Sequence, residues 1–420
     1  MTKPTTLIAC HECDLLQREV PVPSGRVVRC RRCGSELYRS AHRTIDHSLA
    51  FTLTAAMLFI VANAYPIVGL EVQGTRNATT LLGSVYTLWA QDMWIVALLV
   101  FVTTFLVPAV QLTVMLHLLV ALKLREVPTG ITVIMRILQW INPWGMVEVF
   151  MLGILVALVK LTHFAHVIPG LALWSFGILT LLLAAAASSF DPRDVWDRIS
   201  KRGTSHRRGE AETAAASGLF SCHVCGLISR LPHGAGGTLL CPRCHAHLHF
   251  CKPHSVSRAW ALLIAAYIMY IPANLLPIME TGSLFGAQDD TIMSGVVFLW
   301  HSGSWDLALV VFIASVVVPL MKMIALTVLL ISVQRRSVWQ PFQRTRLYRL
   351  VELVGRWSML DVYVVTILAA LVQIGSLATI KAGPAALAFG AVVVLTMFAA
   401  MEFDPRMIWD PIQKERPPHD

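Results

Sequence analysis

The chain has 420 residues, of which 56% are hydrophobic and 14% are charged, and its mean hydropathy is +0.64. A soluble domain carries about a quarter charged residues, so this composition excludes an ordinary soluble protein and indicates a membrane protein. The net charge of +9 is compatible with a nucleic-acid-binding protein, but the positions of the basic residues, described below, argue against one.

Residues 1–46 are polar, basic and rich in cysteine, so we expect a small soluble domain here and no secretory signal. Apolar stretches that reach the roughly 20 residues needed to cross a bilayer then predict eight spans in two sets of four. The predicted spans are 48–68, 94–120, 145–165 and 167–189 in the first set, and 257–278, 305–332, 357–378 and 384–402 in the second. We therefore predict an all-α polytopic membrane protein.

The two halves of the chain repeat one another. Short motifs recur at offsets that drift only from 211 to 213 residues, which chance does not explain. The repeated pairs are Cys10 and Cys222, Ala62-Asn63 and Ala273-Asn274, Leu88-Trp89 and Leu299-Trp300, Val107-Pro108 and Val318-Pro319, and Phe190-Asp191-Pro192-Arg193 and Phe403-Asp404-Pro405-Arg406. Each copy has an even number of spans, so both copies lie the same way up, as parallel repeats.

The duplication divides the chain into four predicted domains. They are a ribbon at 1–46, a transmembrane bundle at 47–198, a linker with a second ribbon at 199–255, and a second bundle with a tail at 256–420. Within the bundles, Pro66 and Pro277 should end their helices, whereas Pro108 and Pro319 lie mid-span and should kink theirs.

Basic residues predict the orientation of the bundles. Of the 34 Lys and Arg residues, all but four fall in segments that share one side of the membrane; Arg76, Lys160 and Lys381 fall on the other side, and Lys322 lies inside a span. Cytoplasmic loops carry the excess of Lys and Arg, so we expect both termini and both ribbons to be cytoplasmic. The net charge then reflects topology, and we expect no nucleic-acid partner.

Eight of the nine cysteines form four Cys-x-x-Cys pairs: Cys10 with Cys13, Cys30 with Cys33, Cys222 with Cys225, and Cys241 with Cys244. Two such pairs place four thiolates around one ion, so the sequence predicts one tetrahedral metal site in each ribbon. We expect two zinc ions, and iron remains an alternative because the same four-sulfur geometry suits it. A closed site has no open position for a substrate, so its expected role is structural.

Polar residues inside the predicted spans are the candidate transport site, because charges within a bilayer are costly and usually face a bundle interior. Ser315 and Lys322 share one helical face, and Ser358 and Asp361 share another. We predict a polar network in the second bundle, in which Lys322 pairs with Asp361. Its members are Lys322, Asp361, Ser315, Ser358 and Thr396, with Glu148 as the first-repeat counterpart of Asp361.

A structural alternative exists for each member of this network. Asp361 and Glu148 lie at the cytoplasmic ends of their spans, where a helix dipole and water favour a carboxylate anyway. Hydroxyl groups in spans commonly bond back to helix carbonyls. Lys322 lies too far from either end of its span to reach water easily, so it is the strongest candidate. No Walker loop, Gly-x-Ser-x-Gly or His-Glu-x-x-His motif is present, and we predict no enzyme.

Three kinds of motif occur together over nearly the whole chain. They are the ribbon openings Cys10-His11-Glu12-Cys13 and Cys222-His223-Val224-Cys225, the Asn-x-x-Pro ends of the first and fifth spans, and the Phe-Asp-Pro-Arg exits. In this combination the sequence resembles the paraquat-inducible protein A (PqiA) family. The resemblance implies a Gram-negative inner-membrane protein with a role in envelope lipid trafficking. It also implies phospholipid cargo and a periplasmic MCE-domain tunnel protein as the partner. The alternatives are a scaffold that anchors the tunnel without transporting lipid, and a rubredoxin-like membrane redox protein.

Overall fold

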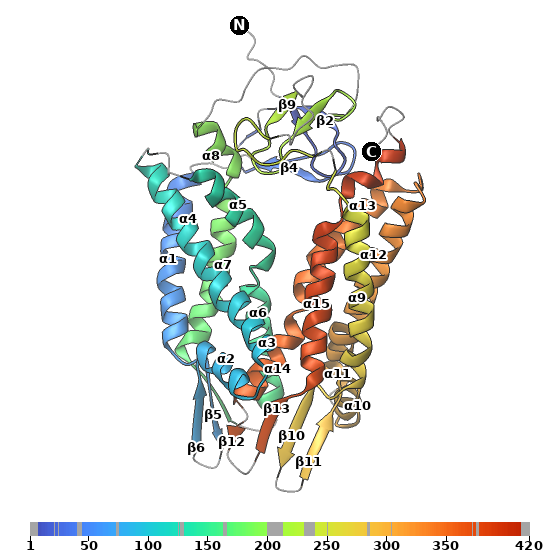
Figure 1. Cartoon of the computed structure of the whole chain (residues 1–420). Coiled ribbons are helices and arrows are strands. Elements are labelled where there is room, and N and C mark those ends of the chain that lie inside the picture. The colour runs from blue at the N-terminus through green and yellow to red at the C-terminus, as the bar shows by residue number, and fades with distance from the viewer. Residues whose placement is uncertain are drawn as a thin grey trace.

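The computed structural model describes residues 7–20, 22–23, 25–39, 44–72, 75–124, 126, 130–162, 166–199, 213–230, 240–249, 251–283, 286–303, 305–371, 373–374 and 378–412. Two helical bundles stand next to each other, both ribbons lie across one end of the pair, and small β-sheets lie at the other end (Figure 1). The predicted class, a mostly helical membrane protein with two four-cysteine ribbons, is confirmed.

The two ribbons are built from short antiparallel hairpins, each of which carries a Cys-x-x-Cys turn. Ribbon 1 contains β1 (Leu7–Ala9), β2 (Leu16–Arg18), β3 (Val27–Arg29) and β4 (Glu36–Arg39). Ribbon 2 contains β8 (Leu219–Ser221), β9 (Ile228–Arg230) and an isolated bridge between Leu240 and His247. Strands this short bury little apolar surface, so the ribbons need another source of stability.

The first bundle follows ribbon 1. Its helices are α1 (Thr44–Ala64), α2 (Leu81–Ala90), α3 (Trp94–Phe101), α4 (Val107–Lys123), α5 (Ile131–Ile141), α6 (Val147–Thr162), α7 (Leu171–Ser189) and α8 (Pro192–Ile199), with the π-helical turn η1 (Val102–Leu106) and the 3₁₀ turn η2 (Asn142–Trp144). Helix α1 packs along α7 and α4.

The second bundle repeats this order. Its helices are α9 (Ser255–Leu275), α10 (Ile292–His301), α11 (Trp305–Phe312), α12 (Val318–Gln334), α13 (Pro341–Trp357), α14 (Leu360–Leu371) and α15 (Pro384–Glu402), with the π-helical turn η3 (Ile313–Val317) and the 3₁₀ turns η4 (Pro405–Ile408) and η5 (Asp410–Ile412). Helix α9 packs along α15, as α1 does along α7.

Two of the four prolines named above follow helix ends as expected, and the other two lie beside π-helical turns. Helices α1 and α9 end just before Pro66 and Pro277. Pro108 and Pro319 each follow a five-residue π-helical turn. Proline cannot donate a hydrogen bond to the preceding turn, and a widened turn accommodates that loss inside a continuous helix.

Two small sheets at the end opposite the ribbons were not predicted. The first has the order β6-β5-β7 and the second β11-β10-β13-β12, with all neighbours antiparallel. Their strands are β5 (Val68–Val72), β6 (Thr75–Thr79), β7 (His166–Pro169), β10 (Met279–Ser283), β11 (Gly286–Asp290), β12 (Gln373–Ile374) and β13 (Ala378–Ala382). Sequences such as Thr-Arg-Asn-Ala-Thr lack an alternating apolar pattern, so periodicity gives no strand signal there.

In the described part of the chain, seven helices are long and apolar enough to cross a membrane. They match seven of the eight predicted spans. The third match, Ile131–Val159, joins α5 and α6 across η2, and α6 alone corresponds to the predicted span. The seventh prediction, 357–378, corresponds to α14, whose 12 residues extend only about 18 Å. A turn between Trp357 and Leu360 separates α14 from α13.

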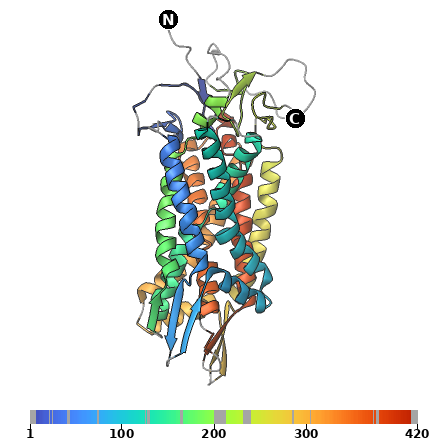
Figure 2. The ribbon, with the colours of Figure 1, turned by 90° about the vertical axis from the view of Figure 1, so that its left-hand side faces the viewer.

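The two bundles meet along α6 and α14 (Figure 1). Figure 2 views the pair from the side of the first bundle, with the second bundle behind it. Phe150 of α6 packs edge-on against Tyr363 of α14, with ring centroids 5.3 Å apart. These two residues are 213 positions apart in the sequence, so they occupy equivalent places in the two repeats. The aromatic pair therefore joins equivalent positions of the two repeats where the bundles meet.

Candidate metal centres and a buried lysine

Both predicted four-cysteine sets assemble in space. In ribbon 1, the Sγ atoms of Cys10 and Cys33 are 3.5 Å apart, as are those of Cys13 and Cys30. In ribbon 2 the corresponding distances are 3.4 Å for Cys222 and Cys244 and 3.5 Å for Cys225 and Cys241. All sulfur atoms of a set lie within 4.8 Å of one another, and all eight cysteines are buried. Each set could hold one metal ion.

The turns that carry the cysteines share one backbone conformation. The residue after the second cysteine of each pair has a positive φ: 59° at Asp14, 73° at Gly34, 68° at Gly226 and 52° at His245. The N–H of this residue donates to the carbonyl of the first cysteine of its pair. His245 therefore adopts the same turn after Cys244 as the glycine that follows Cys33. Four buried sulfur ligands per site suit zinc, whose structural sites are closed and tetrahedral.

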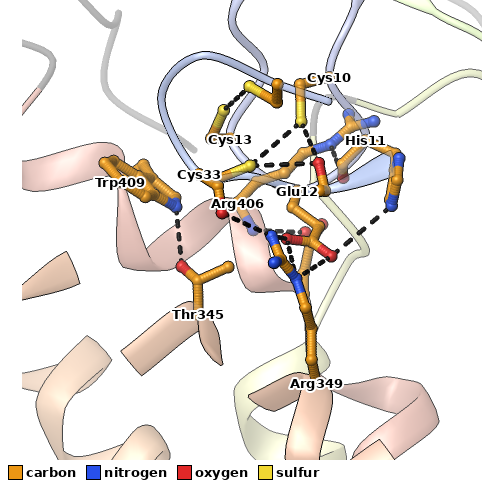
Figure 3. A network of polar contacts seen from close by, with 12 residues as sticks. Cys10, His11, Glu12, Cys13, Cys33, Thr345, Arg349, Arg406 and Trp409 are labelled. Atoms are coloured by element: carbon orange, nitrogen blue, oxygen red, sulfur yellow. Dashed lines mark hydrogen bonds and ion pairs between the residues drawn. The ribbon is translucent and has the colours of Figure 1, made fainter. Parts of the chain in front are cut away.

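Ribbon 1 docks on the end of the second bundle (Figure 3). Arg349 of α13 donates from Nε to both carboxylate oxygens of Glu12, at 2.9 Å each, and from Nη2 to the carbonyl of Cys33 at 2.8 Å. The guanidinium of Arg32 lies 4.7 Å from the ring centroid of Trp409. Arg406, which is 4% exposed, donates to the carbonyl of His11.

Ribbon 2 docks on the end of the first bundle. Arg136 of α5 donates to the carbonyl of Cys244 at 3.0 Å, and Gln139 donates to that of Val224 at 2.9 Å. The guanidinium of Arg243 lies 5.4 Å from the ring centroid of Trp196. The main contacts of each ribbon are thus with the bundle of the other repeat. In addition, the guanidinium of Arg193 in the first bundle lies 5.3 Å from the ring centroid of Tyr38 in ribbon 1, and His223 of ribbon 2 lies near Arg406.

The two ribbons also contact each other. Ala214 donates its backbone N–H to the carbonyl of Asp14 at 3.0 Å, and Ala215 donates to the Asp14 carboxylate at 2.8 Å. An antiparallel bridge joins Leu15 to Thr213. The ribbon pair therefore spans both bundle ends as one continuous layer.

The pKa values of Glu12 and His223 in this layer are shifted in ways that the contacts explain. Burial alone raises the pKa of Glu12, but hydrogen bonds from His11 and Arg349 lower it more, so its net pKa is below the ordinary value. His223 faces a cavity of about 570 Å³ between the ribbons and the first bundle. The residue is exposed, yet the surrounding protein partly desolvates its imidazole. This desolvation, with the nearby charge of Arg406, lowers the pKa of His223 to about 4.

Lys322 of α12 is buried, with 3% of its surface exposed, and its Nζ has no hydrogen-bond partner among the described residues. It lies against Gly355 of α13, where a methyl group would approach Nζ to 3.2 Å. Ser358 donates to the carbonyl of Gly355 at 2.9 Å. The lysine therefore points at the break between α13 and α14. Its first-repeat counterpart, Gln111, lies in the same way near Gly145, at the break between α5 and α6.

The other predicted network members lie in several places. Ser315 is buried in η3, and Thr396 is buried in α15, where its hydroxyl donates to the carbonyl of Val393. Glu148 is exposed in the first turn of α6. Asp361 lies in the first turn of α14, but its side chain is outside the described part of the structure. The predicted Lys322–Asp361 pair stays a prediction.

Sequence reasoning missed the docking residues. Arg32 and Arg243 each lie between the cysteines of a Cys-x-x-Cys pair, and each stacks on a tryptophan. Trp196 and Trp409 follow the two Phe-Asp-Pro-Arg exits at the same spacing. The available signal was the repeat itself, because Arg136 and Arg349 recur at an offset of 213 residues.

The family model for paraquat-inducible protein A matches residues 45–200 and, a second time, residues 256–413. The chain belongs to the paraquat-inducible protein A family. The two matches cover the two bundles and agree with the duplication, while both ribbons lie outside the matched segments.

Curated relatives cover nearly the whole of this family member. It is 33% identical to the intermembrane transport protein PqiA of Escherichia coli K12, over 96% of this chain and 95% of that protein. It is 30% identical to the lipophilic envelope-spanning tunnel protein A of the same strain, over 96% and 90%. A probable intermembrane transport protein of Haemophilus influenzae is 27% identical, over 98% of both chains. No solved structure matches.

Proposed function

We propose that this family member is an inner-membrane component of an envelope lipid-trafficking system. It moves or loads phospholipids between the inner membrane and a periplasmic tunnel formed by an MCE-domain protein. The observation that carries the proposal is the near full-length similarity to proteins named for intermembrane transport and for a lipophilic envelope-spanning tunnel. Those names denote transport, and we assign no enzymatic activity.

The proposed orientation places the ribbons in the cytoplasm, as the distribution of Lys and Arg favours. The two sheets at the opposite end of the bundles then face the periplasm, where the tunnel partner would bind. We further propose the four domains predicted above, with one zinc ion in each ribbon. Four buried cysteines per site support zinc.

The proposed transport site is centred on Lys322. An ammonium group buried without a described partner is costly inside a membrane protein and usually marks a functional site. It faces a helix break, and broken helices line the substrate and ion sites of many transporters. The proposed network comprises Lys322, Asp361, Ser315, Ser358 and Thr396, with Glu148 as the first-repeat equivalent of Asp361.

The test is complementation of a deletion strain under detergent stress, with membrane levels matched by immunoblot. Lys322→Gln gives the second repeat the residue of the first and removes the charge, and we expect survival to fall at least about tenfold. Gln111→Ala is the matched control at the equivalent helix break, and we expect nearly full complementation. Full complementation by both Lys322→Gln and Asp361→Asn would contradict the transport site and favour the scaffold.

Lipid handling is tested directly with the purified protein in nanodiscs that contain a fluorescent phospholipid. We expect the wild-type protein to transfer lipid to its soluble tunnel partner, and Lys322→Gln to transfer it more slowly at equal partner binding. Equal transfer by an empty nanodisc would refute the loading role.

A further inference from the structure

The described contacts of each ribbon include two arginine contacts that recur in the other repeat. In the first, an arginine of the helix before the break binds the carbonyl of the last metal cysteine: Arg349 binds Cys33, and Arg136 binds Cys244. These arginines are 213 residues apart and these cysteines 211. The contact is therefore one interaction made twice, each time between repeats.

The second recurring contact also joins the ribbon of one repeat to the bundle of the other. Arg32 stacks on Trp409, and Arg243 stacks on Trp196. The arginines lie between the cysteines of the second pair of each ribbon. Trp196 lies in α8 and Trp409 directly follows η4. Two independent contacts, each duplicated and each crossed, define a docking surface at both bundle ends.

We infer that the cytoplasmic end of each bundle is a docking surface for the metal-loaded ribbon of the other repeat, so that metal bound in one repeat holds the opposite bundle. This inference goes beyond lipid transport and does not depend on it. The reason lies in the acceptor atoms. The carbonyls of Cys33 and Cys244 belong to the metal-ligand turns themselves, and a ribbon this small takes its folding energy from its metal.

The apolar contacts agree with this assignment. The cysteines of ribbon 1 share a buried cluster with Tyr348, Phe403 and Trp409 of the second repeat. The cysteines of ribbon 2 share another with Met135 and Trp196 of the first repeat. Loss of a metal would therefore expose apolar surface on the bundle of the other repeat.

Hydrogen exchange measured by mass spectrometry on the full-length protein in detergent tests the inference. The double variant Cys10→Ser/Cys13→Ser should accelerate exchange in α13 and η4 at least about tenfold and change α5 by less than about twofold. Cys222→Ser/Cys225→Ser should give the reverse pattern. Faster exchange in the bundle of the same repeat, in both bundles equally or in neither would overturn the inference.

Contact variants that retain both metals provide a second test if the cysteine variants cannot be purified. Arg349→Met should accelerate exchange in ribbon 1 but not in ribbon 2, and Arg136→Met the reverse, while elemental analysis still finds two zinc ions per chain. Arg346→Met is the matched control, because this exposed arginine on α13 has no hydrogen bond or ion pair within the described structure. Exchange in both ribbons equal to that of the control would refute the docking surface.

Discussion

The ion pair between Glu12 and Arg349 should respond differently to the loss of each partner. The Glu12 side chain is 8% exposed, whereas that of Arg349 is 31% exposed. Arg349→Met leaves the buried carboxylate of Glu12 without its partner, and removing one partner of a buried ion pair lowers stability by about 3 kcal/mol or more. Glu12→Ala leaves an arginine that can still reach water and that keeps its bond to the carbonyl of Cys33, so the loss is nearer about 1.5 kcal/mol.

Hydrogen exchange in ribbon 1 measures both losses as changes in the free energy of local opening. Since about 1.4 kcal/mol corresponds to a tenfold change, exchange should accelerate about 100-fold in Arg349→Met and about tenfold in Glu12→Ala. The exposed Arg346→Met reports the effect of losing a charge from the same helix, and we expect less than about twofold. An acceleration in Glu12→Ala that equals or exceeds that in Arg349→Met would refute the reasoning from burial.

Three further predictions concern pH, backbone packing and metal. The pKa of Glu12 is lowered in the folded protein, so the ion pair should stabilise docking above the ordinary glutamate pKa of about 4.3. The difference in the free energy of local opening between wild type and Glu12→Gln should be constant from neutral pH to that value and should vanish as the pH falls further. A difference that grows on acidification would contradict this sign. Gly170→Ala would place a Cβ 2.1 Å from the carbonyl oxygen of Pro66, and Gly383→Ala would repeat the clash at 2.2 Å from that of Pro277. Each should lower the free energy of unfolding by about 3 kcal/mol because a backbone atom cannot move aside. Gly295→Ala is the control for the loss of a glycine alone, because no atom lies near its Cβ position and its φ is not in the left-handed region. Elemental analysis of the purified protein should find two zinc ions per chain, and the solution should be colourless. Iron together with visible absorbance would instead favour the redox alternative.

Much of this architecture could be predicted from the residues alone. The Cys-x-x-Cys pairs predict both four-cysteine clusters, and the offset between Pro66 and Pro277 predicts that the two bundles repeat one another. Span length is harder to predict, because the apolar run 357–378 contains both the helix break after Trp357 and the start of a strand segment. Hydropathy averages over such a break and does not detect it.

The crossed docking could not be predicted, and the reason is physical. A repeat shows that Arg136 and Arg349 are equivalent, but equivalence holds whether each arginine binds its own ribbon or the opposite one. The choice depends on the path of the linker and on the packing of Trp196 and Trp409, which sequence spacing does not encode. Lys322 was found because a charge deep in a span is unusual, and no pattern identifies its neighbour Gly355.

The crossed ribbons also bear on what the duplication achieves. A protein with only one such repeat would find the docking surface for its ribbon on a second molecule, so it would assemble as a swapped dimer whose population depends on concentration. Joining two repeats in one polypeptide makes the same exchange intramolecular, at an effective concentration on the order of millimolar. In this arrangement the linker between the first bundle and ribbon 2 joins the two repeats, so the exchange of ribbons does not depend on protein concentration.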